Sequence, residues 1–117
     1  MSHSRMSLPV IAIDIKNYRI RIHKNTLHSI GNPKYILLLV NPEDHTIAII
    51  CSDRSDPKAH RMNKASELYS KSLVSSLLDV CKDWQENKLY HIFGEIIHDK
   101  GAVKFKMDES VLVNGDK

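Results

Sequence analysis

The side chains best suited to chemistry in this sequence are basic and lie close together in its first quarter. Five of them fall within nine positions: Lys16, Arg19, Arg21, His23 and Lys24. If residues 19–23 form a strand, alternation turns Arg19, Arg21 and His23 to one side, opposite Ile20 and Ile22. Such a row can contact phosphates, and an arginine fork can bind guanine edges in a wide groove. The charge pattern alone favours a second interpretation, the solvent face of an antiparallel sheet, where basic residues also protect strand edges.

A second group of basic side chains lies in the middle of the chain: Arg54, Lys58, His60, Arg61 and Lys64. The formal net charge of the whole chain is +3 with all histidines neutral. This mild positive balance is compatible with a polyanionic partner, and it argues against strong non-specific binding to DNA.

Seven histidines raise the question of a metal site. Zinc ligands usually occur at short paired spacings. His23 and His28 are five residues apart, but the end of a strand and the face of a helix would aim them differently. In the strand predicted near residue 91, His91 shares a face with Phe93, whereas His98 points the other way. Scattered surface histidines are the favoured interpretation, and no metal site is predicted.

The sequence offers no recognisable catalytic site. Cys51 and Cys81 both lie in apolar segments, where a buried reduced thiol is expected. No Gly-x-Ser-x-Gly elbow is present, and the four glycines are not clustered into a phosphate-binding loop. Carboxylate pairs such as Asp53 with Asp56, or Asp108 with Glu109, lie in polar segments that favour solvated charges. The sequence therefore predicts a protein that is not an enzyme and that needs no cofactor.

The composition is that of an ordinary globular domain. Hydrophobic residues make up 42% of the 117 residues and charged residues 26%, which favours one domain over residues 1–117. No run approaches the roughly 20 apolar residues needed to cross a bilayer. The first seven residues lack the apolar core of a signal peptide, so a cytoplasmic protein with no membrane contact is expected.

Hydrophobic periodicity predicts a β-β-α-β-β portion over residues 10–52. Residues 10–15 and 19–23 alternate as strands, and Ile11, Ile13 and Ile15 share one face. A short helix begins near Asn25 or Thr26 and ends at residues 31–33, Gly-Asn-Pro. Residues 35–40 and 46–51 form a hairpin around a turn in which Asn41 can bond back to the backbone.

The second half is predicted to contain one main helix and a second hairpin. Residues 53–66 form an exposed polar connection. The portion at 67–107 holds an amphipathic helix, from Ser70 or Ser72 to residue 86, and a hairpin of residues 90–97 and 102–107 around an Asp-Lys-Gly turn. Residues 1–8 are expected to be a flexible N-terminus, and residues 108–117 a tail with one helical turn. The predicted fold class is α+β, with small antiparallel sheets built from two hairpins, one main amphipathic helix and one short helix.

The stretch Tyr-Arg-Ile-Arg-Ile-His-Lys-Asn-Thr-Leu-His-Ser-Ile-Gly, residues 18–31, resembles the core of the AbrB/MazE/SpoVT-type swapped-hairpin proteins. In that family a Gly-Arg-(Val/Ile)-x-(Ile/Leu)-Pro strand runs into a short helix ending in Leu-Gly, and a hairpin follows. Arg19 falls on the family's arginine, and Lys24 and Leu27 fit the helix start. The resemblance spans residues 18–51 and implies an intertwined dimer with DNA-binding basic residues on the strand and nearby loop.

Two departures from the family pattern lie at the corner between strand and helix. Tyr18 stands where the family has glycine, and His23 stands where it has proline. Residues 53–107 have no place in the family core and would form an added oligomerisation or ligand domain.

Two functions of different classes follow as expectations. In the first, the chain is a homodimeric DNA-binding transcriptional regulator that contacts DNA through Lys16, Arg19, Arg21 and Lys24. In the second, it is a protein-protein interaction module, an accessory protein of a phage or mobile element that binds no nucleic acid. The contact would then be an exposed β-edge or the helix carrying Trp84, although core packing is the favoured role for that tryptophan.

Overall fold

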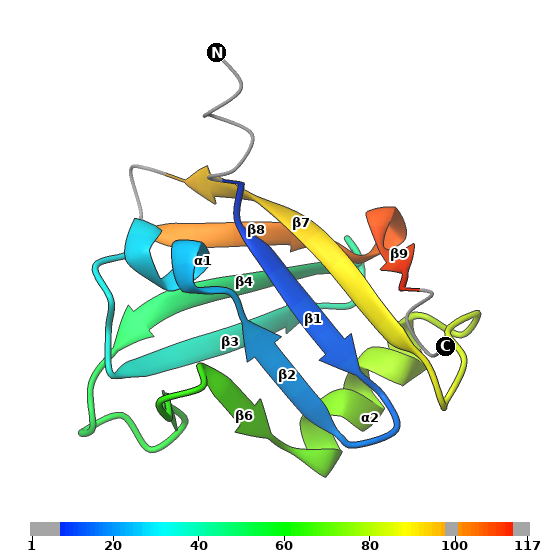
Figure 1. Cartoon of the computed structure of the whole chain (residues 1–117), viewed down its shortest axis with the longest axis horizontal. Helices are drawn as coiled ribbons and strands as arrows, with labels where there is room; N and C mark the ends of the chain where they lie inside the picture. The colour runs from blue at the N-terminus through cyan, green and yellow to red at the C-terminus, as the bar shows by residue number, and fades with distance from the viewer. Residues whose placement is uncertain (1–7, 98–100, 114–117) are drawn as a thin grey trace.

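The computed structural model describes residues 8–97 and 101–113 of the chain (Figure 1). Within them the strands are β1 (Val10–Asp14), β2 (Arg19–Ile22), β3 (Tyr35–Asn41), β4 (Thr46–Ser52), β5 (His60–Arg61), β6 (Glu67–Tyr69), β7 (Leu89–Ile97), β8 (Ala102–Lys106) and β9 (Val111–Leu112). The helices are α1 (Lys24–Ser29), α2 (Lys71–Val80) and a 3-10 turn, η3 (Met107–Glu109).

The strands form one antiparallel sheet that curls into a nearly closed barrel. Its order is β5-β3-β4-β8-β7-β1-β2-β6, and β9 pairs with β7 on the side away from β1. Figure 1 shows β1, β2 and the first part of β7 crossing in front of β3, β4 and β8. The predicted α+β class with sheets built from two hairpins is therefore wrong, and the fold is predominantly β. Its hairpins are joined into one sheet because β1 pairs with β7 and β4 pairs with β8.

β7 belongs to both layers, and it changes layer at Gly94. Residues 89–93 pair with β1, whereas Gly94–Ile97 pair with β8. Gly94 lies opposite Phe105, and a Cβ added at Gly94 would lie 2.5 Å from the ring of Phe105. Since Phe105 is fully buried, its ring has little freedom to move away. Glycine is required here because the ring fills the space that a side chain would take.

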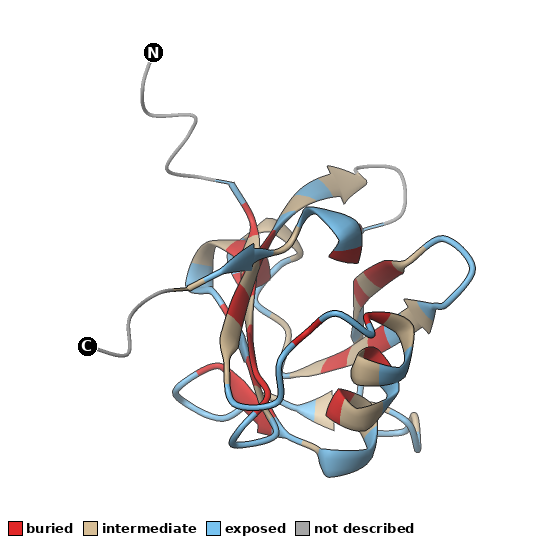
Figure 2. Cartoon of the chain, turned by 90° about the vertical axis from the view of Figure 1, so that its right-hand side faces the viewer, coloured by how far each residue is buried: buried red, intermediate tan, exposed pale blue. Residues whose placement is uncertain are grey.

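The core lies between the two layers, where alternate residues of the long strands are buried, and Figure 2 colours the buried positions red. On β1 and β2, Ile11, Ile13, Ile20 and Ile22 are fully buried, and Ile15 is nearly so, which confirms the alternation predicted for both strands. α2 adds Val74 and Leu77 and covers the end of the barrel at which β2 and β7 begin. One cluster of buried side chains thus connects both halves of the chain.

The main helix is shorter than predicted. It begins as expected at Ser70, whose side chain accepts a hydrogen bond from the amide of Leu73, but it ends at Val80 instead of residue 86. Beyond it, Trp84 stacks on Tyr90 with ring centres 4.8 Å apart and donates to the hydroxyl of Ser110 at 3.0 Å. Trp84 is 8% exposed and belongs to the core, which confirms core packing as its role. Lys82, Gln85 and Glu86 favour a helix, so these tertiary contacts, rather than local propensity, decide where the helix stops.

The first predicted hairpin is confirmed in detail. β3 and β4 pair from Tyr35 with Ser52 to Asn41 with Thr46. The side-chain oxygen of Asn41 accepts hydrogen bonds from the backbone amides of Glu43 and Asp44, at 3.0 and 3.3 Å. α1 ends before Gly31, which has φ +90°, as predicted.

Other predicted segments are only partly described. β7 and β8 pair as a hairpin, but Asp99 and Lys100 of its turn lie outside the described residues, as do residues 1–7 and 114–117. The one helical turn predicted for the tail is η3, and β9 follows it. The polar connection contains the short strand β5, and β6 precedes the main helix where no strand was predicted.

We expect Gly94→Ala to lower the free energy of unfolding by about 1–3 kcal/mol, because the new methyl group overpacks the ring of Phe105. Urea unfolding followed by circular dichroism measures the change. The loss should be smaller when Gly94→Ala is made in a Phe105→Leu background, where the ring is gone. Equal losses in both backgrounds would show that the contact does not constrain the bend.

Candidate functional site

The outer face of β7, β1 and β2 carries the most distinctive arrangement of side chains. Strand pairing aligns them in three rows across the strands. The first row holds Phe93, Val10 and His23; the second holds His91, Ala12, Arg21 and Glu67; the third holds Leu89, Asp14, Arg19 and Tyr69.

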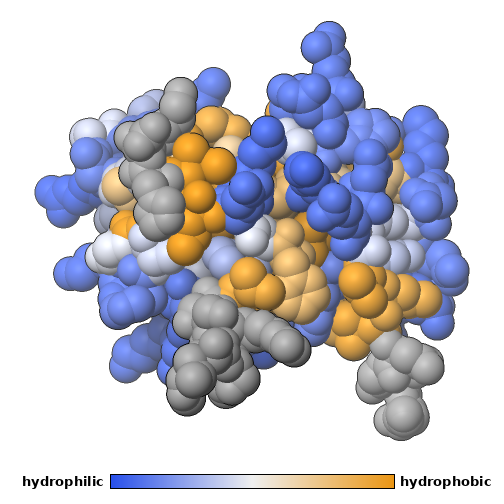
Figure 3. Space-filling model, turned by 90° about the horizontal axis from the view of Figure 1, so that it is seen from above, coloured by the Kyte–Doolittle hydropathy of each residue, from blue (hydrophilic) through white to orange (hydrophobic). Residues whose placement is uncertain are grey.

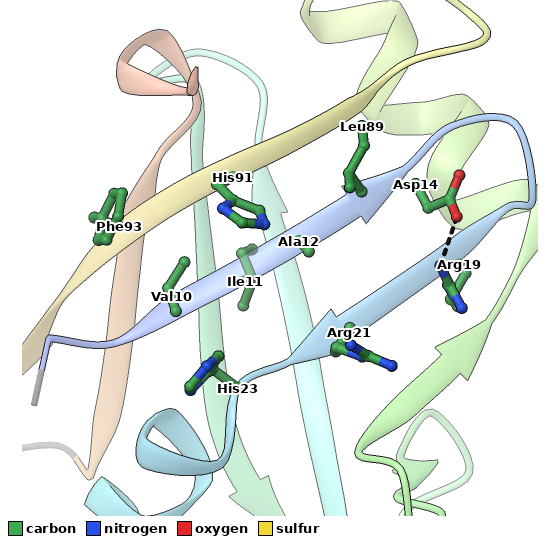
Figure 4. Close-up of a pocket in the computed structure, with 10 residues that line it drawn as sticks. All are labelled: Val10, Ile11, Ala12, Asp14, Arg19, Arg21, His23, Leu89, His91 and Phe93. Atoms are coloured by element: carbon green, nitrogen blue, oxygen red, sulfur yellow. Dashed lines mark hydrogen bonds and ion pairs between the residues drawn. The ribbon is translucent and has the colours of Figure 1, made fainter. Parts of the chain in front are cut away.

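These rows form a groove because the middle strand carries the smallest side chains. Val10 and Ala12 lie on β1, between larger side chains on both neighbouring strands. The resulting cavity, here called the outer groove, has a volume of about 330 Å³ (Figure 4). One wall is formed by Leu89, His91 and Phe93 of β7. The other wall is formed by Arg19 and Arg21 of β2 and by His23, which follows β2. The groove is therefore amphipathic across its width, with an aromatic side and a basic side.

Two carboxylates bind the arginines of the basic wall. Arg19 donates to Asp14 at 2.8 Å and to Glu67 at 3.4 Å, and Arg21 donates to Glu67 at 3.0 Å. Both carboxylates belong to residues only 8% exposed. Partial burial opposes the charge of Arg19, but the hydroxyl of Tyr69, Asp14 and Glu67 together hold the pKa of Arg19 above its ordinary value. Arg19 and Arg21 do share one face opposite the buried isoleucines, as predicted, yet their charges are compensated within the sheet.

The four basic residues predicted to contact DNA do not form one cluster. Lys16 lies in the turn between β1 and β2 and lines a separate depression beside Asn17 and Lys88. Lys24 lies at the opposite end of β2, at the first residue of α1. Arg19 and Arg21 occupy the strand between them, next to Asp14 and Glu67.

A different basic cluster lies where β2 runs into α1. Arg21, His23, Lys24 and Lys64 line a depression of about 390 Å³, here called the cationic depression, and none of its described lining residues carries a carboxylate. It adjoins the outer groove, since Arg21 and His23 line both hollows. In the part of the chain that the structure describes, no carboxylate lies within ion-pair distance of Lys24 or Lys64.

Sequence reasoning placed Lys64 in a separate basic group and missed this cluster. Lys64 comes close because the amide of Ile22 donates to the carbonyl of Ser66 at 2.8 Å, which holds residues 64–66 beside the end of β2. Sequence reasoning likewise missed His91 and Phe93 as neighbours of the basic strand. The alternation of buried and exposed residues along β7 predicts that His91 and Phe93 share a face. No local sequence pattern predicts that β7 pairs with β1, which brings them beside the basic strand.

His91 is the histidine whose titration is altered by this site. Burial, and then the nearby His23, lower the pKa of His91 from its ordinary value of 6.5. A neutral imidazole is therefore favoured at pH 7. Its ring then offers the groove an uncharged flat surface next to Phe93.

The described residues show little that suits catalysis. Burial raises the pKa of the Cys81 thiol to about 11, so it stays protonated and unreactive, as expected. The prediction of a buried thiol is wrong for Cys51, which is exposed because it lies near the end of β4, beyond the core. Among residues 8–97 and 101–113, no three histidine, cysteine or acidic side chains are arranged to hold a metal ion, and no helix is long and apolar enough to cross a membrane.

No protein family, curated protein or solved structure shows a significant match to the chain. The site is therefore interpreted from its own geometry.

We expect the pKa of His91, measured by NMR titration of its ring resonances, to lie below 6.5. In His23→Gln the pKa of His91 should rise yet stay below 6.5, because burial is the larger cause. Since the folded state disfavours the charged ring, this shift costs stability as the pH falls through 6.5 and costs none well above it. A titration midpoint at or above 6.5 would contradict the described burial.

We expect Arg19→Ala/Arg21→Ala to lower the free energy of unfolding by about 1–3 kcal/mol, because it leaves the buried carboxylate of Glu67 without a cation. Adding Glu67→Gln should restore part of that loss, as measured by urea unfolding at pH 7. If the triple variant is no more stable than the double variant, the ion pairs have no stabilising role. Because the double variant is expected to be less stable, a loss of DNA binding in it would not by itself identify Arg19 and Arg21 as DNA contacts.

Proposed function

We propose that this protein is a non-enzymatic nucleic-acid-binding module that contacts phosphates through the cationic depression. The supporting observation is the convergence of Arg21, His23, Lys24 and Lys64 on one hollow whose described lining has no carboxylate. Nucleic acids carry a dense row of negative charge, and lysine and arginine bind it by releasing condensed counterions.

The electrostatics favour this cluster over the row predicted from the sequence. Lys24 and Lys64 are exposed, and within the described residues neither is neutralised by an ion pair. Arg21 shares its charge with Glu67, but its side chain remains 55% exposed and can also contact a ligand. The proposed phosphate contacts are therefore Arg21, His23, Lys24 and Lys64. Arg21 and Lys24 were also predicted from the sequence, whereas Arg19 and Lys16 are no longer among the proposed contacts.

A homodimer, a role in transcription regulation and the resemblance of residues 18–51 to swapped-hairpin proteins stay predictions. We also propose the cytoplasm as the compartment, and the free state of Cys51 and Cys81 agrees with a reducing environment.

A protein partner is the second candidate, and one observation favours it. β9 pairs on one side with β7, and its residues Val111 and Leu112 are 53% and 44% exposed. A short apolar strand of this kind can accept a further strand from another chain. Association through β9 would not depend on salt, which separates it from binding at the cationic depression.

We expect fluorescence anisotropy to show binding of a labelled 20-nucleotide DNA that weakens steeply between 50 and 200 mM salt. In Lys24→Gln/Lys64→Gln the affinity should fall, and the slope of log affinity against log salt should be shallower by roughly 1.4–1.8, at 0.7–0.9 per lost phosphate contact. Light scattering in the same buffers measures the molecular mass and tests the homodimer.

The matched control is Lys104→Gln/Lys106→Gln, which removes the same charge from exposed positions on β8. It should leave the salt slope nearly unchanged. Absence of binding at 50 mM salt would contradict the proposal. Equal effects of the two double variants would show that attraction is spread over the whole surface and is not centred on the cationic depression.

A further inference from the structure

We infer that the nucleic acid held by this surface is single-stranded, with bases stacked on Phe93 and His91 in the outer groove and phosphates on the cationic depression. This inference rests on the proposed function and adds the form of the ligand. Two observations support it: the groove has an aromatic wall opposite a basic wall, and the cations without carboxylate partners lie at one end of the groove.

Phe93 is a large aromatic side chain with no role in the core. It is 50% exposed, while its neighbour Ile92 points inward and is fully buried. The next residue, Gly94, has no side chain, and the facing residue on β1 is the small Val10. Phe93 thus lines the outer groove with half of its surface exposed (Figure 4). Base stacking on such an exposed aromatic ring is a main source of affinity for single strands.

His91 provides a second ring on the same wall. It lies two residues before Phe93 on the same side of β7, so the two side chains start about 7 Å apart. The lowered pKa of His91 keeps its ring neutral near pH 7. An extended strand with unstacked bases can place neighbouring bases on two such rings.

The charge of the basic wall changes along the groove. Asp14 lies at the end marked by Leu89 and Arg19, where it would repel phosphate, and Glu67 lies in the middle row beside Arg21. The opposite end, at His23, lies beside the cationic depression. Phe93 lies in the same cross-strand row as His23, so the aromatic ring and the uncompensated cations meet at one end. A nucleotide bound there would have its base on β7 and its phosphate towards β2 and α1.

A double helix suits this surface less well. Its base faces are stacked on each other, so an aromatic wall would have nothing to contact. Proteins read the major groove with an inserted helix or β-ribbon, whereas this face is hollowed along β1. Figure 3 shows apolar patches between hydrophilic side chains on the face seen from above.

The test compares three labelled probes with similar numbers of phosphates: a 12-nucleotide oligo-dT, an abasic oligomer of that length, and a duplex of six G·C base pairs closed at one end by a non-nucleotide linker. Anisotropy at 50 mM salt should show that the oligo-dT binds tightest. Phe93→Ala should weaken oligo-dT binding about 5- to 100-fold, because stacking on one base is lost. Binding of the abasic oligomer itself should change little.

Two further variants complete the design. Ala12→Leu fills the floor of the outer groove from an outward-facing position and should weaken oligo-dT in the same way. Leu39→Ala, which truncates a 48% exposed side chain on β3, is the matched control and should have no effect. Circular dichroism of each variant checks that the fold is retained.

The outcomes separate the inference from the function on which it rests. If the duplex binds as well as oligo-dT, and Phe93→Ala changes neither, the single-strand inference is overturned while binding at Lys24 and Lys64 stands. If no probe binds at 50 mM salt, both fall. Binding confined to a labelled peptide of alternating glutamate and leucine would also overturn both and assign the groove to an acidic protein segment.

Discussion

The barrel depends on the passage of β7 from one layer to the other at Gly94, where the ring of Phe105 occupies the space of a side chain. Before this point β7 pairs with β1, and after it β7 pairs with β8. This one strand therefore connects β1 and β2 to β8, β4 and β3 in a single sheet. The same bend fixes the outer groove, because it leaves Phe93 as the last residue paired with β1. A close contact inside the core therefore determines where an aromatic ring stands on the surface.

The buried carboxylate of Glu67 has a comparable influence on the charge of the surface. It binds both arginines of β2, and Asp14 binds Arg19 as well, so the most basic strand of the sequence is nearly neutral on its outer face. Of the arginines and lysines that line the outer groove and the cationic depression, Lys24 and Lys64 are the ones with no ion pair among the described residues. Cross-strand pairing thus moves the centre of positive charge from the middle of β2 to its end, and it does so with residues far apart in the sequence.

Sequence patterns predicted the elements that have a clear period or a distinct turn. The alternation of β1 and β2, the turn at Asn41 and the cap at Ser70 were all readable, because each depends on neighbours within a few residues. The strands β5, β6 and β9 have only two or three residues, too few to show a period. The fold class was wrong for the same reason that half of the site was missed. The pairing of β1 with β7 and the approach of Lys64 to β2 are tertiary contacts that leave no local mark in the sequence.

β1 carries two independent sets of residues. Its odd positions, Ile11 and Ile13, are fully buried, while its even positions, Val10 and Ala12, form the floor of the outer groove. Because side chains on opposite faces of a strand do not touch, the groove can change in depth without disturbing the packing beneath it. Substitutions at positions 10 and 12 can therefore reshape the groove without loss of folding, which makes this face of the barrel tolerant of sequence change.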